Sequence, residues 1–236
     1  EWGANAIFTI ENDDMTFQSY YKLPVPQTPE ENCVAHNGSL IPVPGRDIMV
    51  QAWYQGGVSI FDFTDSAHPV EIAYFDRGPI DAKQLVLGGY WSAYWYNGAI
   101  YASEIARGID VFRLKPSDAL SQHEIDAARS IQFDEVNTQV QKKMVWPATT
   151  AVTMAYVDQL TRSKGIQPQR AKAVRAAMER ADRTRAGSGN RAGAVVGELT
   201  SVAAELEKDA AGASGRDVLS LHALADTMKR RAESLR

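Results

Sequence analysis

The chain has 236 residues, a formal net charge of −4 and a single cysteine. Its hydrophobic content of 44% and charged content of 23% are ordinary for globular proteins, so the composition excludes wholesale disorder and collagen. One cysteine excludes an intrachain disulfide and a cysteine-based zinc cage, and no apolar run is long enough to span a membrane. We therefore expect a globular protein of one large domain or two smaller ones.

Aromatic residues and charge divide the chain into two parts. Twenty of the 21 aromatic residues precede Pro147, the exception being Tyr156. Residues 1–146 contain 10 lysines and arginines against 19 aspartates and glutamates, a net charge of −9. Residues 147–236 contain 15 against 10, a net charge of +5. This contrast indicates two domains with a boundary near Pro147.

Two segments of the first part repeat at a spacing of 51 residues. Residues 57–62 (GVSIFD) match residues 108–113 (GIDVFR), and residues 47–52 match residues 98–103 at the same spacing. Short β runs separated by glycine turns, with a period near 50 residues, are typical of β-propeller blades.

Each repeat divides into four expected strands. In the middle repeat these strands cover residues 33–41, 47–53, 58–63 and 70–75. The next repeat supplies strands at residues 90–96, 99–104 and 109–114. Residues 1–24 supply the last two strands of an earlier repeat. The expected β structure is therefore a partial β-propeller of about two and a half four-stranded blades, in which the N-terminal blades are absent.

Residues 57–70 (GVSIFDFTDSAHPV) resemble the LVIVD repeat family. In that family a Gly-Val-x-Ile-hydrophobic-Asp strand is followed by Ser/Thr-Asp-x-x-x-Pro and another strand. Residues 109–114 resemble a degenerate copy, with Arg113 where the aspartate should be. The resemblance, which extends to an alanine-rich helical tail after the propeller, implies the C-terminal part of a secreted bacterial β-propeller protein. It implies no reaction, because propellers host binding, scaffolding and catalysis alike.

The second part of the chain has helical spacing. Ser121 and Glu124 have the spacing of a capping box, and Pro168 suits the first turn of a helix. Glycine-containing breaks at residues 187–189 and 212–215 separate further apolar stripes. Short connections between such helices predict an antiparallel α-helical bundle of three or four helices. The expected domains are propeller blades over 1–115, a connecting helical segment over 116–147 and the bundle over 148–236.

Polar and aromatic residues at equivalent corners of successive blades form the candidate binding site. In a propeller, the start of each innermost strand and the turn between the second and third strands emerge on one face. Seven side chains are therefore expected around one funnel mouth: His36, Asn37, Tyr54, Trp91, Ser92, Glu104 and Arg107. Aromatic walls with a few polar groups suit a small molecule, a glycan or a protein. The other interpretation is that these side chains only tie the blades together.

Other chemistries lack a supporting sequence pattern. The histidines form no His-x-His or His-x-x-x-His pair, and no cofactor or metal is predicted. There is no Gly-x-Ser-x-Gly elbow, and Cys33 is expected to be a small buried hydrophobe. Basic residues of the tail alternate with acidic ones and lack aromatic neighbours, so nucleic acid is not an expected partner.

The expected function is noncatalytic binding of a ligand or a protein. The alternative is a propeller enzyme, a hydrolase or an oxidase, with His36 at a metal or acid–base site completed by absent blades. The sequence leaves open whether the protein is an enzyme. The opposite net charges of the two parts further predict that the helical tail docks on its own propeller.

Overall fold

A computed structural model describes residues 3–137, 140, 143–184 and 190–236. The described residues form nine strands and five helices, and the chain divides into two compact units. The β unit consists of residues 1–115 and 131–143, and the helical unit consists of residues 116–130 and 144–236. The segment expected to connect the two domains is therefore shared between the units. Docking of the helical tail on the propeller stays a prediction.

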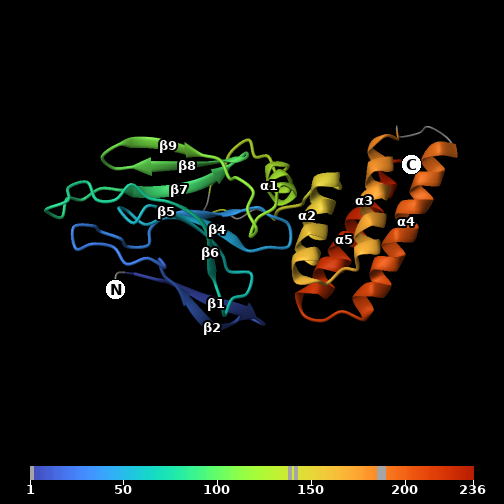
Figure 1. Ribbon diagram of the computed structural model, residues 1–236, viewed down its shortest axis with the longest axis horizontal. Helices are drawn as coiled ribbons and strands as arrows, with labels where there is room; N and C mark the ends of the chain where they lie inside the picture. The colour runs from blue at the N-terminus through green and yellow to red at the C-terminus, as the bar shows by residue number, and fades with distance from the viewer. Residues whose placement is uncertain (1–2, 138–139, 141–142, 185–189) are drawn as a thin grey trace. The chain divides into compact units, whose positions relative to one another are not determined.

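The described strands of the β unit lie in three antiparallel sheets (Figure 1). The hairpin sheet contains β1 (Asn5–Glu11) and β2 (Asp14–Tyr21). The four-stranded sheet contains, in this order, β3 (Gly38–Ile41), β4 (Ile48–Ala52), β5 (Val58–Asp62) and β6 (Val70–Phe75). The three-stranded sheet contains β7 (Tyr90–Tyr96), β8 (Ala99–Glu104) and β9 (Gly108–Phe112). The predicted combination of β structure followed by helices is confirmed.

The sequence repeat of 51 residues is also a repeat of the strand pairing. Met49 of β4 pairs with Phe61 of β5, and Ile100 of β8 pairs with Phe112 of β9. Each residue of the second pair lies 51 positions after its counterpart in the first pair, and the following pairs of the two hairpins keep this shift. Side chains alternate between the faces of a strand, so residues separated by one repeat face equivalent directions in the two sheets.

The four-stranded sheet is covered on both faces. On one face, the Phe61 ring stacks on Tyr21 of the hairpin sheet, with 3.9 Å between the ring centroids. On the other face, Phe75 contacts Phe112 of the three-stranded sheet at 4.8 Å, and β3 and β4 lie beside β7. Figure 1 shows the three sheets in chain order within this unit, with the four-stranded sheet between the other two.

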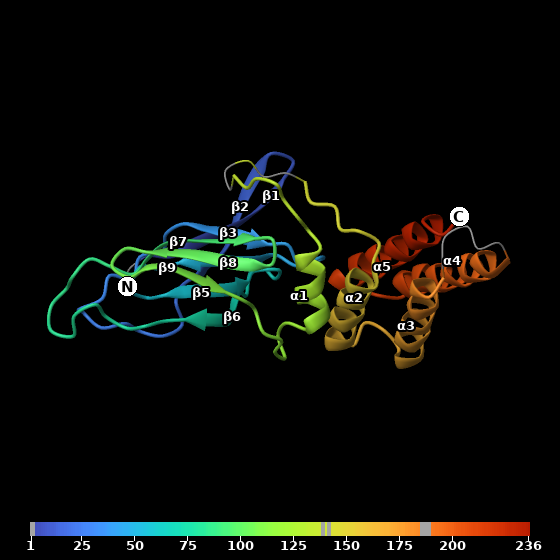
Figure 2. The same ribbon diagram turned by 90° about the horizontal axis from the view of Figure 1, so that it is seen from above.

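The described residues of the helical unit form one short helix and four longer ones. These are α1 (Gln122–Arg129), α2 (Thr150–Ser163), α3 (Pro168–Asp182), α4 (Asn190–Ala211) and α5 (Arg216–Glu233). The predicted capping box between Ser121 and Glu124 is present at the start of α1, and Pro168 opens α3 as predicted. The predicted break at residues 187–189 lies outside the described residues. Figures 1 and 2 show α2 to α5 side by side, running in alternating directions.

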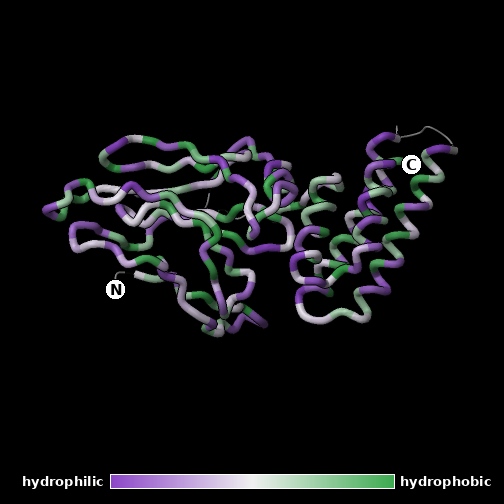
Figure 3. Tube along the Cα trace, in the orientation of Figure 1, coloured by the Kyte–Doolittle hydropathy of each residue, from purple (hydrophilic) through white to green (hydrophobic). Residues whose placement is uncertain are grey.

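Apolar stripes of these helices form the core of the helical unit. Leu199, Leu206, Leu221 and Met228 have 0% of their surface exposed and belong to one cluster. Figure 3 shows hydrophobic and hydrophilic stretches alternating along α4 and α5, as expected for amphipathic helices. No described helix is long and apolar enough to cross a membrane.

Candidate functional site

His36, Tyr54 and Trp91 form an aromatic cluster where the four-stranded and three-stranded sheets meet. The ring centroids lie 4.3 Å apart for His36 and Trp91, 5.0 Å for His36 and Tyr54, and 5.7 Å for Tyr54 and Trp91. Rings at these distances are in direct contact, so a ligand can reach only the outer surface of the cluster. Trp91 contributes to that surface, because 49% of it is exposed.

His36 and Trp91 occupy equivalent positions at the starts of two inner strands. Leu40 pairs with Met49, and Trp95 pairs with Ile100, so β7 corresponds to β3 at a shift of 55 residues. His36 and Trp91 have that same spacing, as do Asn37 and Ser92, which form a parallel bridge between the sheets. The shift exceeds 51 residues because the turn from β7 to β8 is four residues shorter than the turn from β3 to β4. The two sheets therefore meet through matching corners.

Backbone hydrogen bonds fix Tyr54 in this corner. Tyr54 N donates to Tyr90 O at 3.0 Å, and Tyr90 N donates to Tyr54 O at 2.8 Å. Tyr54 has a φ of 51°, in the left-handed region that costs a side-chain-bearing residue about 1–2 kcal/mol. Gly89 allows the close approach, because a Cβ at this position would lie 2.0 Å from the Tyr54 carbonyl carbon. The conformation of Tyr54 thus depends on the contact between the sheets.

The hydrogen bond of His36 determines which ring nitrogen carries the proton. His36 Nδ1 lies 2.5 Å from Trp91 O. A carbonyl oxygen can only accept, so Nδ1 donates and Nε2 of the neutral ring is an acceptor. Nε2, the Asn37 amide and the Tyr54 hydroxyl have no hydrogen-bond partner among the described residues. The His36 Nε2 and the Tyr54 hydroxyl of the cluster are therefore available to a ligand, and so is the amide of the exposed Asn37.

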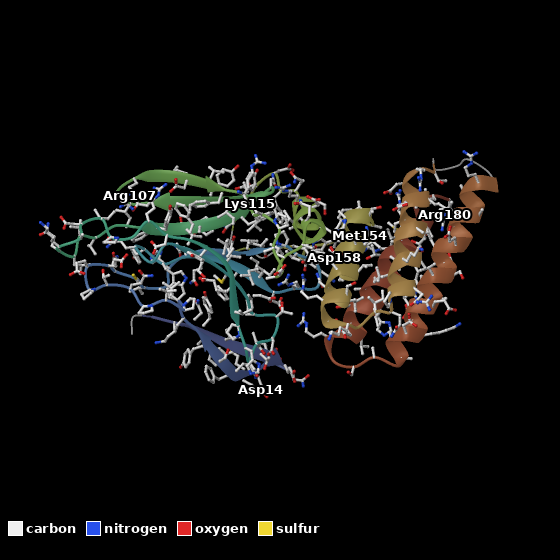
Figure 4. All side chains as sticks on the ribbon, viewed as in Figure 1. Asp14, Arg107, Lys115, Met154, Asp158 and Arg180 are labelled. Carbon is white, nitrogen blue, oxygen red and sulfur yellow. The ribbon has the colours of Figure 1, made fainter. Side chains whose placement is uncertain are left out.

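The other three predicted residues are placed differently. The Ser92 hydroxyl lies 2.8 Å from the Ser103 hydroxyl and is used within the sheet. Glu104 is 4% exposed, and its Oε1 accepts from Gly89 N at 2.6 Å. Its buried Oε2 has no partner in the described part of the chain. Arg107 lies in the exposed turn between β8 and β9 (Figure 4), and its guanidinium donates to Pro79 O at 3.5 Å.

Gln55 and Gly89 were not among the predicted site residues, although Gln55 follows Tyr54 in the chain and Gly89 approaches the Tyr54 backbone. Gln55 is 2% exposed, and its Nε2 donates to Asn32 Oδ1 at 2.6 Å and to Val86 O at 2.8 Å. Its Oε1 accepts from Ile80 N at 2.6 Å, so one amide holds the long loop between β6 and β7. The double glycine at residues 88–89, directly before a strand, was the available signal for a close backbone approach.

Groups associated with metal or nucleophilic chemistry do not gather at this corner. No cluster of three His, Cys, Asp or Glu side chains able to hold a metal ion occurs within the described ranges. Cys33 is 7% exposed, and burial raises the pKa of its thiol to about 12. The thiol therefore keeps its proton at neutral pH, which matches the prediction of a small buried hydrophobe.

No protein-family model matches the chain, and no curated protein sequence matches it significantly. The resemblance to the LVIVD repeat therefore rests on residues 57–70 and on the repeated spacing. The argument for a function rests on the geometry of the corner formed by His36, Tyr54 and Trp91.

Proposed function

We propose that the β unit is a noncatalytic binding module of an LVIVD-type β-propeller protein, with the aromatic cluster and Asn37 as its ligand surface. The convergence of His36, Tyr54 and Trp91 from matching corners of successive sheets carries this proposal. The repeat of the strand register supports the propeller fold, because blades are copies of one antiparallel sheet. By the same resemblance, the protein acts outside the cytoplasm.

The chemistry of the surface favours a carbohydrate as the ligand. Trp91 offers a half-exposed indole, on which the apolar face of a sugar ring can stack. His36 Nε2 accepts hydrogen bonds, and the Asn37 amide and the Tyr54 hydroxyl both donate and accept them. An apolar face bordered by hydroxyl groups matches this combination.

A glycan array probed with the full chain tests the proposal, followed by titration of the bound glycan. Trp91→Ala should weaken binding by at least about tenfold, because the stacking surface is removed. Tyr74→Ala is the matched control. Tyr74 is an aromatic residue of β6 outside the cluster, and 74% of it is exposed. An array without any bound glycan, or equal affinities of Trp91→Ala and the unmodified protein, would refute the carbohydrate proposal.

His36 separates binding from the alternative of catalysis. In a binding module, His36→Ala should weaken affinity by about tenfold, the equivalent of one hydrogen bond of about 1.5 kcal/mol. In a hydrolase or an oxidase, it should abolish turnover and leave binding largely intact. His36→Asn is the informative partner variant, because its amide can still donate to Trp91 O while Nε2 is lost. Affinity retained in His36→Asn but not in His36→Ala would show that His36 positions Trp91 without touching the ligand.

A further inference from the structure

The chain contains two Asn-Gly pairs, at residues 37–38 and 97–98, and the environments of their asparagines differ. Asn37 is exposed, and its side-chain amide has no hydrogen-bond partner in the part of the chain that the structure describes. It lies directly before β3, which is an edge strand of the four-stranded sheet. Water can therefore reach this amide, and no other group holds its orientation.

The amide of Asn97, in contrast, is held at both ends. Its Nδ2 donates to Phe133 O at 2.9 Å, and its Oδ1 accepts from Phe133 N at 2.8 Å. Gly98, the glycine of this pair, is buried. Because one backbone residue binds both the donor and the acceptor, the plane of the Asn97 amide is fixed. The two asparagines thus share a sequence motif but not an environment.

A glycine after an asparagine favours an intramolecular reaction of the asparagine side chain. The backbone nitrogen of the glycine attacks the side-chain carbonyl carbon Cγ, and the glycine has no side chain to obstruct this approach. The new N–Cγ bond closes a five-membered succinimide, the Cγ–Nδ2 bond breaks, and Nδ2 leaves as ammonia with the proton of the backbone amide. Water then opens the ring at either carbonyl group and yields aspartate or isoaspartate. The amide must turn toward the glycine nitrogen for the ring to close.

We propose that Asn37 deamidates spontaneously in the folded protein, whereas the hydrogen bonds of Asn97 protect it. The exposed, unheld amide of Asn37 meets the requirement for ring closure, and the doubly bonded amide of Asn97 does not. The glycine after Asn37 is required by the fold, because a Cβ on Gly38 would lie 2.3 Å from Val50 O. The sheet therefore keeps a reactive Asn-Gly pair at this position.

Deamidation of Asn37 would alter the proposed ligand surface, a consequence that rests on the proposed function. An amide that donates and accepts hydrogen bonds becomes a carboxylate that only accepts them, and a negative charge appears next to His36. Isoaspartate also lengthens the backbone by one carbon where Asn37 forms its bridge with Ser92. Asn37→Asp reproduces the aspartate product. It should weaken binding of a glycan found on the array by about tenfold, because the Nδ2 donor is lost.

Mass spectrometry of the full chain, incubated at mildly alkaline pH and then digested with trypsin, tests the proposal. Trypsin places Asn37 in the peptide of residues 23–46 and Asn97 in the peptide of residues 84–107. The first peptide should accumulate the deamidated form at least about tenfold faster, because two hydrogen bonds must break before Asn97 can react. Asn37→Gln, which would need a six-membered ring, should abolish this product. That variant also distinguishes Asn37 from Asn32 in the same peptide.

Unfolding in concentrated urea is the matched control. It removes the hydrogen bonds of Asn97, and it releases the Asn37 backbone, whose O accepts from Ala52 N at 3.0 Å in the folded chain. Both peptides should then deamidate at similar rates. Equal rates in the folded chain, an unreacted Asn37, or a product that persists in Asn37→Gln would overturn the proposal. The masses are measured without a ligand, so this test and the glycan array can fail separately.

Discussion

Leu206 of α4 provides a quantitative test of the core of the helical unit. It has 0% of its surface exposed and shares one apolar cluster with Leu199, Leu221 and Met228. Replacing a buried leucine by alanine removes its packing and leaves a cavity, at a cost of about 3–5 kcal/mol. Leu206→Asp should destabilise the unit by at least as much, because it also buries an unpaired carboxylate.

Thermal unfolding of the full chain, followed by far-UV circular dichroism, measures this loss. In a unit of roughly 100 residues, 1 kcal/mol lowers Tm by about 4–8 °C. Leu206→Ala should therefore lower the Tm of the helices by at least about 12 °C. Leu219→Ala is the control, because Leu219 is 67% exposed and its truncation should cost within about 0.5 kcal/mol. If the two variants melt together, the assignment of Leu206 to the core is wrong.

The remaining predictions concern the β unit. Gly57 and Gly108 are repeat equivalents with φ of +85° and +96°, but a Cβ on Gly57 would lie 2.2 Å from Phe75 O, whereas nothing lies within 4 Å of one on Gly108. Urea unfolding should show Gly57→Ala to be the more destabilising by at least about 1 kcal/mol, and equal losses would contradict the pairing of β5 with β6. Burial and the hydrogen bond to Asp110 raise the pKa of Tyr90 above its ordinary value. Its contribution to stability is therefore complete below about pH 10 and falls as the pH rises further. That fall should be smaller in Tyr90→Phe, and identical pH profiles would argue against the buried phenol.

Strand positions were predictable because the local pattern determines them. The glycine turns and the alternation of apolar residues place β7 at residues 90–96 and β8 at residues 99–104, as predicted. The first inner strand is shorter than the predicted residues 33–41, since β3 begins at Gly38. Before Gly38, the chain makes isolated contacts, such as His36 N with Ala52 O at 2.9 Å, without a continuous ladder. Propensity alone does not distinguish these two kinds of extended backbone.

The meeting of these residues at one corner could be predicted from the strand order, whereas the directions of the side chains within it could not. Strand order brings the start of β7 beside the end of β4, so His36, Tyr54 and Trp91 meet wherever the sheets stack in sequence. Arg107 is in an exposed turn where no ladder fixes its side chain, and its hydrogen bond goes to Pro79 O. Glu104 is the last residue of β8. Its buried carboxylate accepts a hydrogen bond from Gly89 N, directly before β7, and the spacing of residues in the sequence does not reveal this contact.

A comparison of the repeats supports the proposal that this corner is a ligand surface. Where the sheets pack on each other, Phe61 and Phe112 are equivalent aromatic residues, and each packs against the preceding sheet. At the corner the equivalent positions differ: the equivalent of His36 is Trp91, and that of Tyr54 is Ile105. Packing between successive sheets does not require different residues at equivalent positions, because residues of the same kind can fill the interface in each repeat. The repeat therefore does not account for the choice of His36, Tyr54 and Trp91, whereas the proposed ligand surface does, and these residues lie where two of the three sheets meet.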